Sequence, residues 1–324
     1  MSDVRALGAP LGPLREAESA AAPPATSVRR ATLRRILEQR SAVVGLTILG
    51  CLISIALLAD VIAPFRFNEV LIGVEEGVRP RLGPCIHMLG CPDTRPEHLM
   101  GLDGNVRDVF SRVVYGARVS LTVGFVTVGA AILVGMLIGS VAGFAGGRVD
   151  NVLMRLMDVV LAFPALLLAL VIVTVLWEVR EIGRLEKAML AVAIVGIPVY
   201  ARVMRSAVLT VREQDYVTAA RALGDSPLNI LARRVIPNAI TPLIVQGTLG
   251  IGTAVLEIAA LSFLGLAAGE PVAEWGLMIG RERSQMFAAP HLIFFPGIML
   301  TLTVLGFNLL GDGLRDALDP RLQR

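Results

Sequence analysis

The chain has 324 residues, of which 55% are hydrophobic and 18% are charged, and its formal net charge is +3. This composition is typical of an integral membrane protein, so we expect contact with membrane lipid and none with nucleic acid. It excludes an ordinary soluble domain. Lys187 is the only lysine. Because a P-loop needs a lysine in a glycine-rich turn that opens a helix, the chain is expected not to hydrolyse ATP by that route.

Residues 1–40 contain no apolar run long enough for a signal peptide, and we predict a tail that ends in a short basic helix. Five arginines precede the first apolar run: Arg29, Arg30, Arg34, Arg35 and Arg40. Since basic residues mark the cytoplasmic flank of a span, the amino terminus is predicted to be cytoplasmic. Residues 41–63 can cross a hydrocarbon core of about 30 Å at about 1.5 Å per residue.

The long polar segment over residues 64–117 is then predicted to be extracytoplasmic, and it carries Cys85, His87, Cys91 and His98. Their spacing fits no closed tetrahedral metal site. An oxidising compartment favours a disulfide between Cys85 and Cys91 that pins the loop. Two free thiols and a metal site are the alternatives.

Further apolar runs complete an all-α bundle of six transmembrane helices, with a core over residues 118–311 and a carboxyl-terminal tail over 312–324. The runs cover about 119–144, 151–176, 189–204, 239–266 and 290–310. In the first of them, Gly135, Gly139 and Gly143 repeat every four residues and predict a smooth face for a neighbouring helix. Pro164 predicts a kink in the third span.

Two carboxylates lie inside apolar runs. Glu257 falls within the fifth span and Asp158 near the inner end of the third. An ionisable residue in a span is costly unless it faces a cavity or a partner, which makes it a hypothesis for a functional site. Glu257 is predicted either to line a translocation path or to form a structural hydrogen bond across a subunit interface, and Asp158 is the second candidate for the path.

A polar interruption, DYVTAARALGDSPLNILARRVIPN over residues 215–238, follows the fourth span. Asp215 is predicted to cap a first helix that ends at Gly224 in the left-handed conformation. Ser226 is predicted to cap a second helix with Pro227 at its first position and Pro237 at its end. Small residues leave one face of the first helix bare, with arginines around it. The residues proposed to contact a partner are Asp215, Ala219, Ala220, Arg221, Gly224, Asp225, Ser226, Arg233, Arg234 and Pro237.

These residues carry a resemblance to a known family. The spacing from Ala219 and Ala220 through Gly224 to Pro237 resembles the "EAA" loop of ABC importer permeases, although Thr218 stands where that loop usually has glutamate. Residues 101–121, the segment PVAEWG from Pro271 to Gly276, and the ending FNLLGDGLRDALDPRLQ are similar to the dipeptide, oligopeptide and nickel branch. The segment around Trp275 is expected at the outer mouth, with Trp275 as an interfacial anchor.

The resemblance implies a non-catalytic permease subunit for dipeptides or oligopeptides in the bacterial inner membrane, with both termini cytoplasmic. It implies a second homologous permease, two ABC ATPase subunits and an extracytoplasmic binding protein as partners. Residues 206–238 would form the coupling loop, and alternating access would move the cargo. The chain itself would bind no cofactor or metal, because ATP and magnesium would sit on the partner subunits.

Other readings remain open at this point. Nickel, glutathione or another small cargo would use much the same permease motifs. An ion-driven secondary transporter would call for an inverted repeat or paired ionisable residues at the bilayer midplane. The sequence shows one such carboxylate, Glu257, and no convincing repeat.

Overall fold

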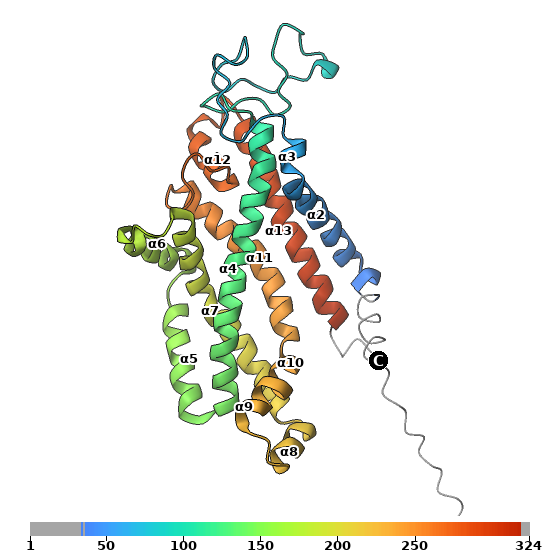
Figure 1. Ribbon diagram of the computed structural model, residues 1–324, viewed down its shortest axis with the longest axis vertical. Coiled ribbons are helices and arrows are strands. Elements are labelled where there is room, and N and C mark those ends of the chain that lie inside the picture. The colour runs from blue at the N-terminus through green and yellow to red at the C-terminus, as the bar shows by residue number, and fades with distance from the viewer. Residues whose placement is uncertain (1–33, 35, 319–324) are drawn as a thin grey trace, which may run out of the picture.

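The computed structural model describes residue 34 and residues 36–318. Residues 1–33 and 35 of the predicted 1–40 tail, and the last six residues of the chain, lie outside this range. Long helices run side by side along the longest axis of the molecule (Figure 1). The longest are α2 (Arg40–Leu57), α4 (Val109–Ala145), α7 (Arg184–Arg212), α11 (Thr241–Phe263) and α13 (His291–Leu318).

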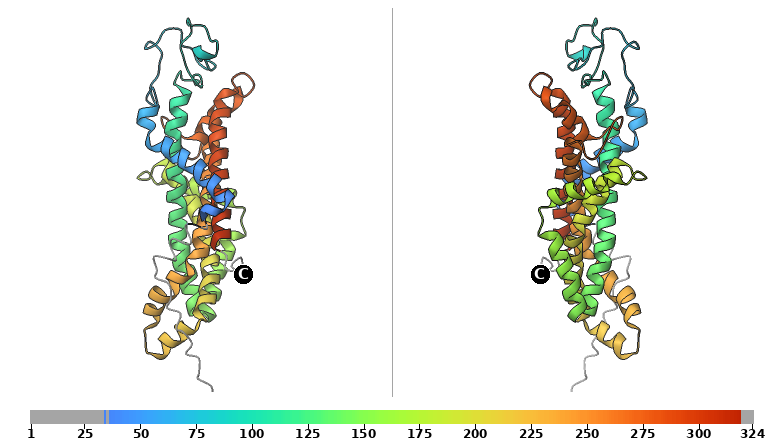
Figure 2. Two further views of the ribbon diagram at one scale, coloured as in Figure 1. Left: turned by 90° about the vertical axis from the view of Figure 1, so that its right-hand side faces the viewer. Right: turned by 90° about the vertical axis from the view of Figure 1, so that its left-hand side faces the viewer.

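Shorter elements connect and cover these five. They are α3 (Ala59–Ile62), η1 (His87–Leu89), α5 (Gly147–Leu161), α6 (Ala165–Val175), η2 (Leu176–Glu178), α8 (Asp215–Ala222), α9 (Pro227–Ile230), η3 (Leu231–Val235), α10 (Ile236–Ala239), α12 (Trp275–Glu282) and η4 (Arg283–Gln285). The segment over residues 63–108 lies at one end of the bundle, the loop end, and α8 with α9 lies at the other, the hairpin end (Figures 1 and 2).

Five helices of the described chain are long and apolar enough to cross a membrane, and a sixth span results if α5 and α6 count as one. The helical bundle of the sequence prediction is therefore confirmed. The third span is not a kinked helix, however, because α5 and α6 meet at a bend of 92°. Pro164 lacks an N–H group and disfavours helical geometry in Phe163 before it, so the helix stops and a new one begins.

Two helices extend well beyond the predicted spans. The helix α4 begins ten residues before the expected start, since the Asp108 carboxylate accepts a 2.7 Å hydrogen bond from the Ser111 N–H and caps it. The helix α7 covers 29 residues, from Arg184 to Arg212. The predicted span over about 189–204 ended where charged residues begin, but in the structure those charged residues continue the helix on both sides of its apolar part.

The glycine face of α4 packs against α7, as predicted. A Cβ atom at Gly139 would overlap the carbonyl oxygen of Ala201, and one at Gly135 would lie 2.7 Å from the Cβ of Tyr200. A Cβ at Gly143 would lie 2.9 Å from the carbonyl oxygen of Arg205. The absence of side chains therefore lets the two backbones approach closely at these three glycines.

Candidate functional site

The hairpin end carries the helical hairpin that joins α7 to α11. Gly224 has φ of +81° and ends α8 in the left-handed region, as predicted. The Ser226 hydroxyl accepts a 3.3 Å hydrogen bond from the Asn229 N–H and caps α9, with Pro227 at its first turn. One local prediction was wrong: Asp215 is the first helical residue of α8, and Gln214 occupies the N-cap position without a capping hydrogen bond from its side chain.

Pro237 does not end the second arm of the hairpin. The arm continues from α9 through the π-helical segment η3 into α10, which ends at Ala239. Pro237 falls in the first turn of α10, where a missing N–H is tolerated. The wider turn of a π-helix directly before it relieves the clash that a proline ring causes in a regular helix.

The hairpin presents a mixed apolar and basic surface. Leu223 and Leu228 are 87% and 79% exposed on either side of the Gly224 turn. The exposed side chains around them are Asp215, Ala219, Arg221, Ala222, Ser226, Arg233, Arg234 and Pro237. Ala220 differs from the prediction of a bare outer face, because it is buried with Val217 against the rest of the chain. Asp225 is half-buried and accepts a hydrogen bond from the Asn229 amide.

A cavity of about 180 Å³ opens among α4, α7, α11 and the break between α5 and α6. Its polar lining is small: Thr127 from α4, Tyr200 from α7, and Gln246, Thr253 and Glu257 from α11. The rest of the wall is apolar and small, namely Val128, Ala131, Val160, Leu161, Phe163, Ala165, Val192, Val195, Gly196, Val199, Gly250 and Ala254. No arginine or lysine of the described chain lines it.

Gln246, Gly250, Thr253 and Glu257 follow one another at spacings of four, three and four residues along α11. Such spacing places side chains on one face of a helix, and this face forms a cavity wall. Gly250 is required there because a Cβ atom would overlap the Tyr200 hydroxyl. The spacing of these four α11 residues could have been recognised from the sequence. Thr127 and Tyr200, in contrast, join the site only because α4 and α7 pack beside α11.

The two predicted path carboxylates lie in different surroundings. Glu257 is half-buried and lines the cavity. Asp158 does not line it; its carboxylate lies 2.5 Å from the guanidinium of Arg202 on the exposed surface. Deeper toward the hairpin, Asp150 of α5 accepts hydrogen bonds of 2.5 and 2.6 Å from Arg205 of α7. The structure therefore leaves Glu257 as the carboxylate in this cavity.

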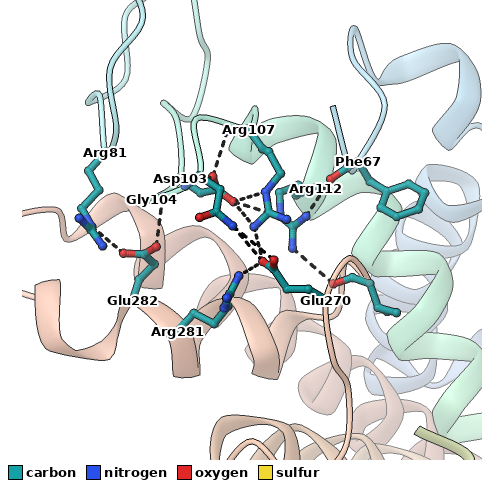
Figure 3. A network of polar contacts seen from close by, with 11 residues as sticks. Phe67, Arg81, Asp103, Gly104, Arg107, Arg112, Glu270, Arg281 and Glu282 are labelled. Carbon is teal, nitrogen blue, oxygen red and sulfur yellow. Dashed lines mark hydrogen bonds and ion pairs between the residues drawn. The ribbon is translucent and has the colours of Figure 1, made fainter. Parts of the chain in front are cut away.

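The loop end contains a network of buried charges that ties the segment before α4 to the segment before α12 (Figure 3). Arg107 donates to Asp103 at 2.8 Å and to Glu270 at 2.6 Å. Arg112 donates to the Phe67 carbonyl at 2.7 Å and lies 3.5 Å from Asp103. Arg281 also contacts Glu270. The charged side chains of residues 103–112 are therefore engaged with one another and with the segments around Phe67 and Glu270.

The segment over residues 63–108 is stabilised by a small apolar core and by a disulfide. Leu71, Leu82, Leu102 and Val106 form a small separate core. The sulfur atoms of Cys85 and Cys91 are bonded to each other, which closes a loop around η1. Cys51 is a free, exposed cysteine on α2.

Trp275 is buried against α4 and is not an interfacial anchor. Trp275 is 0% exposed, and its indole N–H donates to the Val113 carbonyl at 3.0 Å. The Glu274 carboxylate caps α12 by accepting hydrogen bonds from the backbone of Gly276 and Leu277, at 2.9 and 2.7 Å. Burial nevertheless raises the pKa of Glu274 above its ordinary value. Trp275 was misassigned because its burial depends on the close approach of α4.

Comparison with known proteins places this architecture. Residues 135–324 match the family described as the binding-protein-dependent transport system inner membrane component, and residues 27–75 match the N-terminal transmembrane domain of oligopeptide transport permease C. One solved structure with a similar fold is a chain of the inward-facing MetNI methionine ABC transporter, with a TM-score of 0.54 and 18% identity, covering 64% of this chain and 97% of that chain.

Curated relatives are more similar in sequence. The dipeptide transport system permease protein DppC of Alkalihalophilus pseudofirmus is 40% identical over 299 residues, which cover 92% of each chain. The glutathione transport system permease protein GsiD of Pectobacterium atrosepticum is 37% identical over 290 residues, which cover 90% of each chain. The helical bundle, the family match and these relatives agree that the chain belongs to the binding-protein-dependent transport system inner membrane components, the permease subunits of ABC importers.

Proposed function

We propose that this subunit carries peptides of the dipeptide and oligopeptide class across the bacterial inner membrane by alternating access. One observation carries the mechanism: α7 and α11 both line the cavity, and the hairpin over residues 215–238 is the covalent link between them. A force on the hairpin therefore acts on two cavity walls at once. The dipeptide and glutathione permeases among its relatives support a small peptide-like cargo.

The proposed motor is a pair of ABC ATPase subunits that grip this hairpin and that of a second, homologous permease. Exposed Leu223 and Leu228 supply an apolar contact, and the surrounding arginines supply charge complementarity. An extracytoplasmic binding protein would deliver cargo at the loop end. In this proposal both termini and the hairpin lie in the cytoplasm.

ATP binding would close the ATPase dimer, draw the two hairpins together and open the cavity toward the binding protein. Hydrolysis and ADP release would reverse the movement. In this cycle the chain does no chemistry. Its task is to transmit displacement, which the short turn at Gly224 and the cap at Ser226 favour by holding the two arms of the hairpin at a defined angle.

The proposal is tested by Gly224→Val, with Gly73→Val as the matched control. Both glycines have positive φ, +81° and +78°, and neither would bring a Cβ atom within 4 Å of another group. Valine resists this conformation equally at the two sites, but only Gly224 lies in the hairpin. We expect normal membrane insertion for both variants, and lost ATP-dependent dipeptide uptake for Gly224→Val alone.

Equal uptake by the two variants and the wild type, with the same stimulation of ATP hydrolysis, would contradict coupling through the hairpin. Copurification adds an independent check. ATPase subunits should accompany the wild-type permease, whereas a transporter driven by an ion gradient would purify without them and would lose uptake when the gradient is collapsed.

A further inference from the structure

We propose that Glu257 receives a primary ammonium group of the cargo inside the cavity, so that a peptide enters this part of the path with its amino-terminal end. The inference rests on the proposed transport function for its setting. Its physical basis is independent of that function, because it follows from the charges, hydrogen-bonding groups and volume of the cavity.

The charge of the cavity calls for a cation. Among the described residues, no salt bridge or hydrogen bond reaches the Glu257 carboxylate, and no basic side chain lines the cavity. A carboxylate in a membrane span is costly without a partner. Two other carboxylates of the bundle helices have one, since Asp150 meets Arg205 and Asp158 meets Arg202. A cargo ammonium group would supply the missing charge.

The hydrogen-bonding groups fit an ammonium group as well. Thr127 lines the cavity and is 2% exposed, and its buried hydroxyl has no hydrogen-bond partner in the described chain. An unsatisfied buried hydroxyl is uncommon and calls for an explanation. Tyr200 and Thr253 bring two further hydroxyls to the same cavity. An ammonium group has three N–H donors, which one carboxylate and neighbouring hydroxyl oxygens can accept.

The volume and polarity indicate which part of the cargo enters. Ligand sites for drug-sized molecules measure roughly 300–1,000 Å³, whereas a cavity of roughly 150 Å³ holds a molecule the size of benzene. The 180 Å³ here therefore fits one end of a peptide rather than the whole. A carboxylate end would find no cation, and it would face Glu257. The apolar wall from Val128 and Val192 would contact the first side chain.

Carbodiimide labelling of the complete transporter tests this inference without requiring transport. Dicyclohexylcarbodiimide modifies carboxyl groups, and mass spectrometry quantifies the modification of each residue. Ala-Ala should protect Glu257, whereas N-acetyl-Ala-Ala at the same concentration should not, since acetylation removes the ammonium charge. Labelling of Asp158, a carboxylate outside the cavity, serves as the internal control and should be equal with both probes. Equal labelling of Glu257 in both would overturn the inference.

Uptake into proteoliposomes with the binding protein gives the second arm. Glu257→Gln should lower ATP-dependent Ala-Ala uptake by about tenfold to a hundredfold, the effect of losing a charge-assisted hydrogen bond. Glu257→Asp should restore most of it. Unchanged uptake with Glu257→Gln would also overturn the inference. If the wild type itself takes up no Ala-Ala while Ala-Ala still protects Glu257, the peptide function fails and the ammonium site stands.

Discussion

Buried charges at the loop end and in the cavity lie in opposite situations. Arg107 and Arg112 lie 2.8 and 3.5 Å from the Asp103 carboxylate, and Glu270 lies 2.6 Å from Arg107. Glu257 contacts no opposite charge in the described chain, although it lies in a span where isolation costs most. Charges that satisfy one another hold segments together, whereas a charge left without a partner is available to a ligand. The same residue types therefore serve architecture in one place and recognition in the other.

The largest change in stability should come from removing an arginine of the paired network at the loop end. Arg107→Ala removes one of the two basic partners of each of two buried or half-buried carboxylates, Asp103 and Glu270, and we expect a loss of about 3 kcal/mol in the free energy of unfolding. Thermal unfolding of the purified transporter in detergent measures it. Arg118→Ala, in the α4 helix that follows Arg107, is the matched control, because its ion pair with Asp60 is exposed and should matter far less. Equal losses would refute the distinction.

An intermediate effect is expected for the disulfide that supports the loop end. Cys85 and Cys91 are separated by six residues, and closing so short a loop stabilises by about 2 kcal/mol in the chain-entropy account. Replacing both by serine should raise hydrogen exchange in residues 82–98 and leave α4 and α7 unchanged. Alkylation of the unreduced wild type followed by mass spectrometry checks the premise: two alkylated thiols would contradict it.

The smallest change in stability is expected for Glu257, and here the sign of the change decides between the two situations. Glu257→Gln replaces an unpaired charge in a span by a neutral amide, so the permease should become about 1 kcal/mol more stable while it loses uptake. Asp103→Asn, which removes a paired charge, should destabilise instead. Thermal unfolding of the two variants side by side decides the matter. Destabilisation by both would mean that Glu257 also has a structural partner.

Local chemistry allowed the hairpin and the glycine contacts to be predicted from the sequence. Gly224, Ser226 and Pro227 each act through their own backbone or through a residue three positions away, so the turn and the second cap could be derived without knowledge of the fold. Gly135, Gly139 and Gly143 predicted a packing face because their period matches the helix. Glu257 could be singled out because a carboxylate in an apolar run is conspicuous.

Features that depend on distant residues could not be derived in this way. Pro164 gives a bend of 92° rather than a kink, and the break borders a cavity that the local sequence does not reveal. Pro237 is accommodated by the π-helical turn before it. Trp275 is buried because Gly116 of α4 lets the indole ring approach, and a Cβ atom there would lie 2.7 Å from its nitrogen. Thr127 and Tyr200 meet Glu257 only after three helices pack.

Accessibility of the cavity from the two sides of the membrane tests coupling most directly. In a Cys51→Ser background, Thr253→Cys places one reactive thiol on the cavity wall. We predict that a membrane-impermeant thiol reagent reaches it from the hairpin side without nucleotide and from the loop side when a non-hydrolysable ATP analogue is bound to the transporter. Labelling from the same side in both states would contradict the account that the hairpin moves the cavity walls.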